Sequence, residues 1–249
     1  MQRKAIFNNK LLPYLLLAPQ LAITFVFFFW PAGEAVWYSF IRQDAFGIST
    51  QFVWFENFTD LFADPLYHQV ILNTIIFSVA VTFLSMALAL GLAVLADRHI
   101  RGKDGYRTLL IWPYAVAPAI AAILYIFLFH PDIGLIGRAL KAAGIAWNYT
   151  LNGNQAMLVV VLAAAWKQVS YNFLFFLAGL QSIPKSVLEA AAIDGASATY
   201  RFRTVIFPLL SPTTFFLLVI NITYAFFDTF GIIDALTKGG KLVQVGLFG

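Results

Sequence analysis

The chain has 249 residues, of which 61% are hydrophobic and only 11% are charged, and its mean hydropathy is +0.79. A soluble domain is nearer half apolar and a quarter charged, so this composition excludes an ordinary soluble domain, a disordered tail and a typical nucleic-acid-binding protein. The chain has no cysteine, which excludes disulfides and thiolate metal sites, and its net charge is only +4. The surplus of apolar surface predicts a lipid bilayer as its solvent.

Five apolar runs are long enough to cross a bilayer, for which a helix needs about 20 mostly apolar residues. They lie near residues 12–32, 70–95, 107–129, 156–181 and 205–229. The first run follows basic residues as a signal peptide does, but it is long and lacks a small-residue cleavage site. We therefore expect an uncleaved first helix. The fold predicted is an all-α integral membrane protein with five transmembrane helices in a single domain, residues 1–249.

Two prolines, Pro113 and Pro118, lie inside the third run. Each removes a backbone donor and can kink the helix. Such a kink can be purely structural, or it can suit a helix that lines a pathway, where neighbouring groups satisfy the freed carbonyls. The sequence alone leaves both interpretations open.

The distribution of basic residues predicts how the chain is oriented. If every run crosses the membrane, ten basic residues fall on one side: Arg3, Lys4, Lys10, Arg98, Arg101, Lys103, Arg107, Lys185, Arg201 and Arg203. The opposite side has five: Arg42, Arg138, Lys141, Lys238 and Lys241. Because cytoplasmic loops carry an excess of Lys and Arg, we expect a cytoplasmic N-terminus.

Polar residues inside the fourth and fifth runs are candidates for a substrate pathway, because intramembrane polar groups usually face a bundle interior or an aqueous cavity. Lys167 lies near the middle of the fourth run, and the other candidates follow at helical spacing in the two runs: Tyr171, Asn172, Asn221 and Asp228, with Gln168 and Tyr224 beside them. The alternative is an inter-helix pair such as Lys167 with Asp228, which we weigh equally with substrate contact.

The sequence lacks the common catalytic and metal-binding motifs. It has no G-x-x-x-x-G-K-[ST] phosphate loop and no H-E-x-x-H motif. The three histidines, His68, His99 and His130, fall in three different loops that alternate sides of the membrane. We therefore expect no catalytic residue, no metal site and no ATPase activity in this chain.

The loop at residues 182–212 predicts a short helix across the cytoplasmic face. Pro184 ends the fourth run, and Ser186 and Glu189 have the spacing of a capping box. Gly195 suits a left-handed helix stop, and Pro208 suits the first turn of the next membrane helix. The short helix can lie in the lipid headgroup layer, form a simple turn or dock on a cytoplasmic partner.

The same loop resembles a family signature. Glu189-Ala190-Ala191, Asp194-Gly195-Ala196 and Pro208 are similar to the E-A-A…D-G-A…P signature of ABC importer permeases, although Val205 and Phe207 stand where isoleucine and leucine are usual. In that family the loop is a coupling helix that fits a cleft on the ATP-binding subunit. The resemblance implies the fold of a type I ABC importer permease. The coupling residues it implies are Glu189, Ala190, Ala191, Asp194, Gly195 and Pro208.

The resemblance also implies partners and a location. It implies a heterodimer with a second permease subunit, two copies of an ATP-binding subunit, a periplasmic substrate-binding protein and the lipid of the cell inner membrane, but no nucleic acid. This chain itself needs no cofactor in that assembly, because ATP and magnesium bind the ATP-binding subunit.

Other segments resemble the glycerol-phosphate branch of this family more closely. They are 12–20, 113–118, 166–184 and 224–230, whereas 55–58 resembles the outer segment before the second helix of the sugar-type permeases in general. The resemblance implies import of sn-glycerol 3-phosphate or a related glycerophosphodiester. A sugar or oligosaccharide permease of the same family is the first alternative. An integral membrane enzyme and an ion-driven secondary transporter are others, disfavoured because the histidines are scattered and no internal repeat is evident.

The resemblance stops after Gly240, where family members usually continue into a sixth helix. The segment from Leu242 to Phe248 is far shorter than the roughly 20 residues needed to cross a bilayer. We expect this chain to be a fragment, a frameshifted form or a five-helix variant, and not to support full transport as written.

Overall fold

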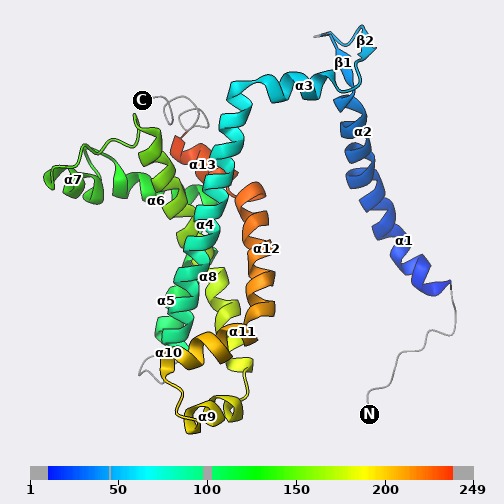
Figure 1. Ribbon diagram of the computed structural model, residues 1–249. Helices are drawn as coiled ribbons and strands as arrows, with labels where there is room; N and C mark the ends of the chain where they lie inside the picture. Colours follow the sequence, from blue (N-terminus) through cyan, green and yellow to red (C-terminus); the bar gives the residue numbers. More distant parts are fainter. Residues whose placement is uncertain (1–10, 45, 98–102, 238–249) are drawn as a thin grey trace. The chain divides into compact units, whose positions relative to one another are not determined.

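The computed structural model describes residues 11–44, 46–97 and 103–237 (Figure 1). The chain divides into two compact units, Met1–His68 and Gln69–Gly249, and each is described by itself. The single domain expected from the sequence stays a prediction. The segment after Gly240, where the predicted resemblance ends, lies outside the described residues.

The first unit begins with one continuous apolar helix, Leu12–Ser39, which is longer than the predicted run at 12–32. It consists of α1 (Leu12–Thr24), the π-helical turn η1 (Phe25–Phe29) and α2 (Trp30–Ser39). The π turn ends two residues before Pro31, which has no backbone N–H to continue a regular helix ladder. None of the 18 residues in its most apolar window is buried, so this helix needs lipid or another apolar surface around it.

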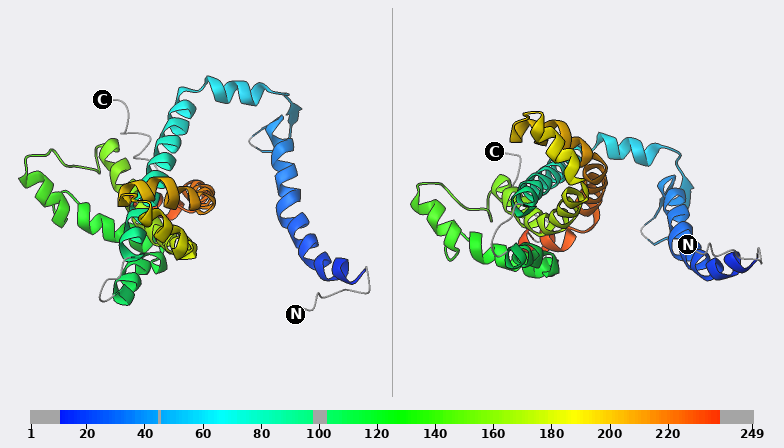
Figure 2. Two further views of the ribbon diagram at one scale, coloured as in Figure 1. Left: turned by 60° about the horizontal axis from the view of Figure 1, so that its bottom comes forward. Right: turned by 90° about the horizontal axis from the view of Figure 1, so that it is seen from below.

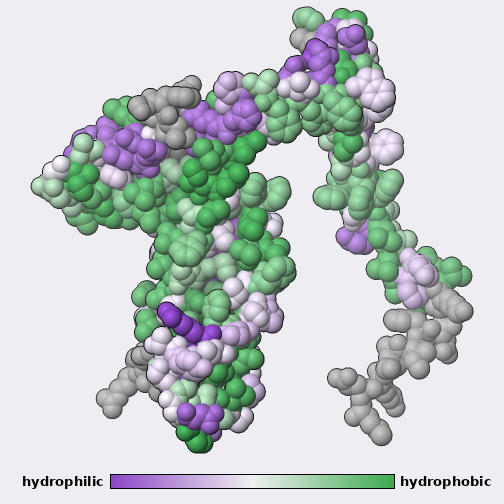
Figure 3. Space-filling model, viewed as in Figure 1, coloured by the Kyte–Doolittle hydropathy of each residue, from purple (hydrophilic) through white to green (hydrophobic). Residues whose placement is uncertain are grey.

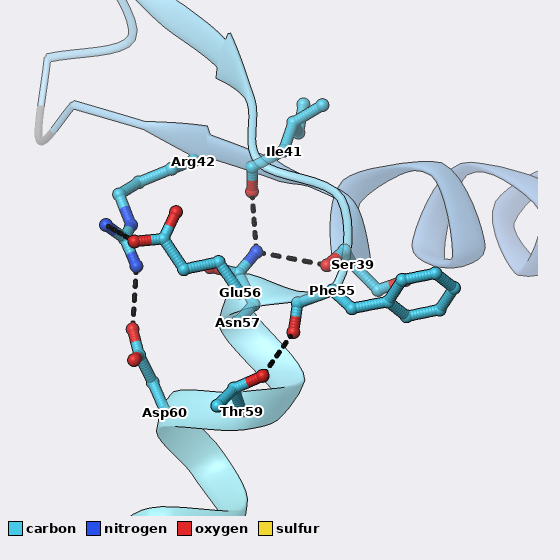
Figure 4. Close-up of polar contacts among 8 residues, drawn as sticks. All are labelled: Ser39, Ile41, Arg42, Phe55, Glu56, Asn57, Thr59 and Asp60. Carbon is cyan, nitrogen blue, oxygen red and sulfur yellow. Dashed lines mark hydrogen bonds and ion pairs between the residues drawn. The ribbon is translucent and has the colours of Figure 1, made fainter.

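A small hairpin and a short helix follow, which the sequence did not predict: β1 (Ile41–Gln43), β2 (Thr50–Phe52) and α3 (Glu56–Ala63). The two strands pair antiparallel, with Arg42 opposite Gln51. Asn57 ties α3 to the chain before it, because its Nδ2 donates to the backbone oxygens of Ser39 and Ile41, each at 3.0 Å (Figure 4).

An ion-pair group completes this segment. The Arg42 guanidinium lies 2.7 Å from a carboxylate oxygen of Asp60 and 3.4 Å from one of Glu56 (Figure 4). All three side chains are about half exposed or more, so each pair contributes little to stability on its own, on the order of 0–1 kcal/mol. Together with Asn57 they hold the hairpin against α3.

The second unit is a helical bundle around α8 (Gly153–Ser182), and Figure 2 gives two further views of it. Helices α5, α6, α12 and α13 pack against α8. The other helices of the unit are α4 (Pro65–Asp97), α5 (Lys103–Ala115), α6 (Pro118–Phe129), α7 (Leu135–Ala142), α9 (Lys185–Ile193), α10 (Ala198–Arg201), η2 (Phe202–Ile206), α11 (Phe207–Leu209), α12 (Ser211–Phe227) and α13 (Phe230–Thr237). Apolar residues cover much of the surface of the bundle in Figure 3, as a lipid-exposed protein requires.

The third predicted run is not one kinked helix. Its two halves, Gly105–Ala115 and Pro118–Phe129, meet at 104°. Ala117 is extended, with φ −60° and ψ 142°, because a residue before proline avoids the helical region. Pro118 then begins a new helix instead of kinking an old one.

The fifth predicted run is also broken, and its start is corrected. Ala198–Leu209 and Ser211–Phe227 meet at 67°, so Pro208 lies in the helical segment before the bend. The long membrane helix α12 begins three residues later, with Pro212 in its first turn. Within the described residues, three helices can cross a membrane by length and composition, or five if each bent pair forms one span. The mostly helical membrane fold is confirmed.

Three fully buried polar side chains join α4, α8 and α12 at Ser85, Asn172 and Asn221. Asn172 Nδ2 donates to Asn221 Oδ1 at 3.0 Å, and Asn221 Nδ2 donates back to Asn172 Oδ1 at 2.7 Å. Ser85 Oγ donates to Asn221 Oδ1 at 2.9 Å and accepts from Asn172 Nδ2 at 3.1 Å. We call these three residues the amide cluster. It fixes the relative positions of three helices inside an apolar bundle.

Close packing brings α8 and α12 together a second time, nearer the loop that connects them. A Cβ added to Gly179 would lie 2.9 Å from Leu210 Cδ2 and 3.1 Å from Thr213 Oγ1. Small residues permit this approach, which is a common way for membrane helices to associate. The two helices that flank α9 are therefore held together at two levels.

The amide cluster generates the first prediction. Asn172→Ala removes the reciprocal amide bonds and leaves part of Asn221 unsatisfied, so we expect a loss of about 1–2 kcal/mol of stability. The unfolding midpoint in detergent should fall by about 2–8 °C. Gln181→Ala, at an exposed position of the same helix, is the matched control. Equal midpoints for the two variants would contradict a stabilising role.

Candidate functional site

A cavity of about 500 Å³ lies between α8, α12 and the break that separates α5 from α6. Its walls combine one cation and one carboxylate with tyrosine rings and other polar side chains, which is unusual inside an apolar bundle. The lining residues that carry polar atoms are Tyr114, Lys167, Gln168, Tyr171, Thr223, Tyr224 and Asp228.

Lys167 meets the broken helix. Its Nζ lies 3.4 Å from the backbone oxygen of Tyr114 and 5.5 Å from the centroid of the Tyr114 ring. Because α5 ends at Ala115, its last carbonyls lack helical partners and are free to accept a donor. The break between the two prolines therefore gives Lys167 an acceptor and an aromatic face, while the side chain keeps part of its surface accessible.

Asp228 ends α12 at the same cavity, and its side chain is exposed. Among the described residues, no ion pair joins Lys167 to Asp228 within 4.0 Å. The inter-helix pair that the sequence allowed is therefore not formed. Instead the cation and the carboxylate border one space, where a ligand with an anionic end and a hydrogen-bonding end can contact both.

The predicted pathway residues separate into two groups. Lys167, Tyr171 and Asp228 line the cavity, with Gln168 and Tyr224 beside them. Asn172 and Asn221 do not line it: both are fully buried in the amide cluster, where their polar atoms are used by other side chains.

Sequence reasoning missed three residues of these sites, namely Tyr114, Thr223 and Ser85. Tyr114 stands next to Pro113, so the paired prolines were the available signal for its placement. Ser85 follows Ser78 and Thr82 at helical spacing in an otherwise apolar run, which indicates an inward face. For Thr223 the sequence offers no comparable signal.

The second candidate site is the loop around α9, which projects beyond the ends of α8 and α12 (Figure 1). The predicted capping box is wrong, because Pro184 occupies the N-cap position and no side chain caps the helix. Ser186 lies inside the first turn instead. The proline ring fixes the backbone angle φ at the start of the helix, so α9 begins here without a side-chain cap.

The end of α9 is as predicted at Gly195, which has a φ of +76°. Its N–H donates to Ala192 O, and the N–H of Ala196 donates to Ala191 O, each at 3.1 Å. These two bonds form a Schellman motif, which favours glycine at this position. Ser197 then begins α10, because its Oγ accepts from the Tyr200 N–H at 3.3 Å.

Much of the surface of α9 is uncovered in this chain. Glu189, Ala190 and Asp194 are exposed, and Ile193 is 86% exposed, whereas Leu188 packs against the bundle core. Pro208, the last residue of the predicted signature, lies outside this helix in α11. A rigid helix with a free outer surface suits docking to another protein.

Within the described residues, no three His, Asp or Glu side chains are grouped so that they could hold a metal ion. The expected absence of a metal site stays a prediction.

Comparisons with known proteins identify the family of the chain. Residues 85–248 match the family described as "Binding-protein-dependent transport system inner membrane component". This match extends eight residues beyond Gly240, where the resemblance was expected to stop. The sn-glycerol-3-phosphate transport system permease protein UgpA of Brucella abortus is 60% identical over 96% of this chain and 81% of its own length. The protein of the same name from Yersinia pseudotuberculosis is 57% identical over 95% of this chain and 80% of its own length.

Two solved structures share the fold. One is a bacterial ABC transporter involved in the import of the acidic polysaccharide alginate, with a TM-score of 0.78 and 21% identity, covering 94% of this chain and 80% of that chain. The other is a bacterial alginate ABC transporter in complex with its alginate pentasaccharide-bound periplasmic protein, with a TM-score of 0.77 and 21% identity, covering 94% of this chain and 79% of that chain. The chain belongs to the family of inner membrane components of binding-protein-dependent ABC transport systems.

Proposed function

We propose that this chain is a permease subunit that carries sn-glycerol 3-phosphate, or a related glycerophosphodiester, across the inner membrane. The observation that carries this proposal is the 60% identity, over 96% of the chain, to permeases named for sn-glycerol 3-phosphate. The cavity adds chemical support, because it holds one cation among neutral polar groups and one carboxylate.

Lys167 is the residue we assign to the phosphate. Its ammonium group offers donors to phosphate oxygens and is already held beside the Tyr114 carbonyl. The glycerol end of the ligand carries hydroxyl groups, which can donate to Asp228 and exchange hydrogen bonds with Thr223 and the tyrosines. Charge at one end and acceptors at the other orient the ligand in the cavity.

A sugar or oligosaccharide is the alternative substrate. The specific observation in its favour is the pair of tyrosine rings that border the cavity, Tyr114 and Tyr171, whose centroids lie 5.8 Å apart. Aromatic faces suit the apolar faces of sugar rings. A phosphate ester and a neutral sugar differ in their need for the cation, since the phosphate ester carries an anionic group for Lys167 and the neutral sugar does not.

The energy for transport comes from a separate subunit in this proposal. Two copies of an ATP-binding subunit bind ATP and magnesium, and one of them receives α9. This chain contributes no catalytic residue. A displacement of α9 reaches the cavity because α8 and α12, which flank the loop, are held together at Gly179 and at the amide cluster.

The remaining partners follow from the same proposal. A second permease subunit completes the pathway, and a periplasmic substrate-binding protein delivers the ligand on the outer side. Uptake that requires ATP and persists with uncouplers at constant ATP distinguishes this importer from a secondary transporter. A membrane enzyme, by contrast, converts the ligand and leaves a new product.

The phosphate contact gives the second prediction. Lys167→Met keeps the side-chain length and removes the charge. Since a charged hydrogen bond is worth about 1.5–3 kcal/mol, we expect the transport efficiency for sn-glycerol 3-phosphate to fall about 10- to 100-fold. Membrane insertion should be unimpaired. The measurement is uptake of labelled substrate at matched expression, with Lys167→Arg as the charge-preserving control.

Two results bear on the alternatives to that contact. Adding Asp228→Asn to Lys167→Met should not restore uptake, because the structure has no ion pair between these side chains within 4.0 Å. Rescue by the double variant would mean that the two residues pair. Full uptake by the single variant would remove Lys167 from the substrate site.

The coupling helix gives the third prediction. Glu189→Lys reverses an exposed charge on α9, and Gly195→Asp places a residue with a Cβ in a left-handed backbone at a cost of about 1 kcal/mol or more. Each variant should insert normally. ATP-driven uptake should fall more than about tenfold, which is the scale expected when a desolvated charge contact between α9 and the ATP-binding subunit is lost. Gly144→Asp is the matched control, because Gly144 is also left-handed, with φ +81°, but lies outside this loop. Normal uptake by both loop variants would contradict the coupling role.

Orientation gives the fourth prediction. The chain has no cysteine, so a single introduced thiol reports one position. In intact cells whose outer membrane has been permeabilised, a membrane-impermeant maleimide should label Ile48→Cys, at a position 86% exposed in the outer hairpin loop. It should not label Ser197→Cys until the inner membrane is opened. The reverse pattern would place the N-terminus outside.

A further inference from the structure

A small notch lies between α9 and α10, with a volume of about 200 Å³. Lys185 and Arg201 border it from the two helices, Leu188 and Ala192 form its apolar part, and Glu189 stands at its edge. The notch is smaller than the roughly 300–1,000 Å³ of an ordinary small-molecule pocket. It suits a single side chain of another protein rather than a separate metabolite.

The two cations of the notch have no charged partner among the residues that the structure describes. Among the described residues, neither the Lys185 ammonium nor the Arg201 guanidinium has an ion pair or a side-chain hydrogen bond. Glu189 is four residues after Lys185, but this order is the weaker one for a helical ion pair, and no contact within 4.0 Å forms.

Lys185 does not stabilise the helix in which it lies. It occupies the first turn of α9, where a cation opposes the helix macrodipole instead of complementing it. A lysine at this position raises the energy of the isolated helix slightly. An anion supplied from outside the chain would remove that cost.

We propose that this notch receives an acidic side chain of the ATP-binding subunit, with its carboxylate held between Lys185 and Arg201. This inference rests on the proposed function, in which the exposed Glu189 carboxylate meets a basic group of the ATP-binding subunit, and it adds a second contact of opposite charge. The coupling surface then carries alternating charges, which fix the register of α9 on its partner more strongly than a single charge.

A protein carboxylate fits the notch better than a lipid phosphate. Glu189 borders the notch and repels a diffuse anionic surface, while a single carboxylate can enter between the cations and leave Glu189 to a basic group of the same partner. The notch is also continuous with the exposed outer surface of α9. One partner protein can therefore cover both the notch and the outer surface of α9.

Carbodiimide cross-linking of the assembled complex tests the contact. This reagent joins a lysine amine to an adjacent carboxylate as an amide. In the wild-type complex, mass spectrometry should find a peptide that joins Lys185 to an Asp or Glu of the ATP-binding subunit. Lys185→Arg keeps the charge and the assembly but has no reactive amine, so this peptide alone should disappear. Cross-linking of Lys185 only to Glu189, or to no residue, in an intact complex would overturn the proposal.

Neutral variants supply the matching binding measurement, made in non-ionic detergent without anionic lipid. Lys185→Gln and Arg201→Gln should each weaken retention of the ATP-binding subunit about fivefold and reduce its salt dependence, on the scale of an exposed ion pair. Arg203→Gln, an exposed cation outside the notch, should retain it as the wild type does. If all three variants retain the ATP-binding subunit equally, the notch contact is overturned but the proposed function is not. A wild-type chain that retains no ATP-binding subunit overturns the proposed function as well.

Discussion

The arrangement of the bundle depends on one buried interaction, the reciprocal amide pair of Asn172 and Asn221 with Ser85 bonded to it. In lipid, apolar surfaces do not drive helices together as they do in water, so specific hydrogen bonds and close packing must do so. The amide cluster supplies those bonds at the point where three helices meet. It positions α8 and α12, and these two helices carry both the cavity and the loop with α9.

A broken helix makes the other half of the site. One straight helix through residues 105–129 would satisfy its own backbone and leave Lys167 without a partner on that side. The extended residue before Pro118 ends α5 and frees the Tyr114 carbonyl for the lysine. Irregular backbone is tolerated at membrane depth only where protein or water satisfies it, and here the Lys167 ammonium donates to the freed Tyr114 carbonyl. The break at the proline pair and the position of Lys167 therefore depend on each other.

Sequence reasoning recovered the features that depend on local chemistry. The apolar runs predicted the helices, Gly195 predicted the left-handed stop of α9, and Lys167 and Asp228 were placed in the cavity region. It failed where the direction of a side chain depends on which helices pack beside it. Helical spacing put Asn172 beside Tyr171 on one polar face, but only the position of α12 determines that Tyr171 faces the cavity and Asn172 faces Asn221. Likewise, Ser186 and Glu189 had capping-box spacing, yet Pro184 had already fixed the helix start.

The proposed transport depends on the binding of a phosphate ester at Lys167 inside this bundle, between an outer delivery protein and an inner ATP-binding subunit. The most direct measurement is a structure of the whole importer trapped with sn-glycerol 3-phosphate. We predict density for the phosphate at hydrogen-bond distance, about 3 Å, from Lys167 Nζ, with the glycerol directed towards Asp228. Phosphate density bound elsewhere in the pathway, with the cavity at Lys167 filled only by water, would contradict the account.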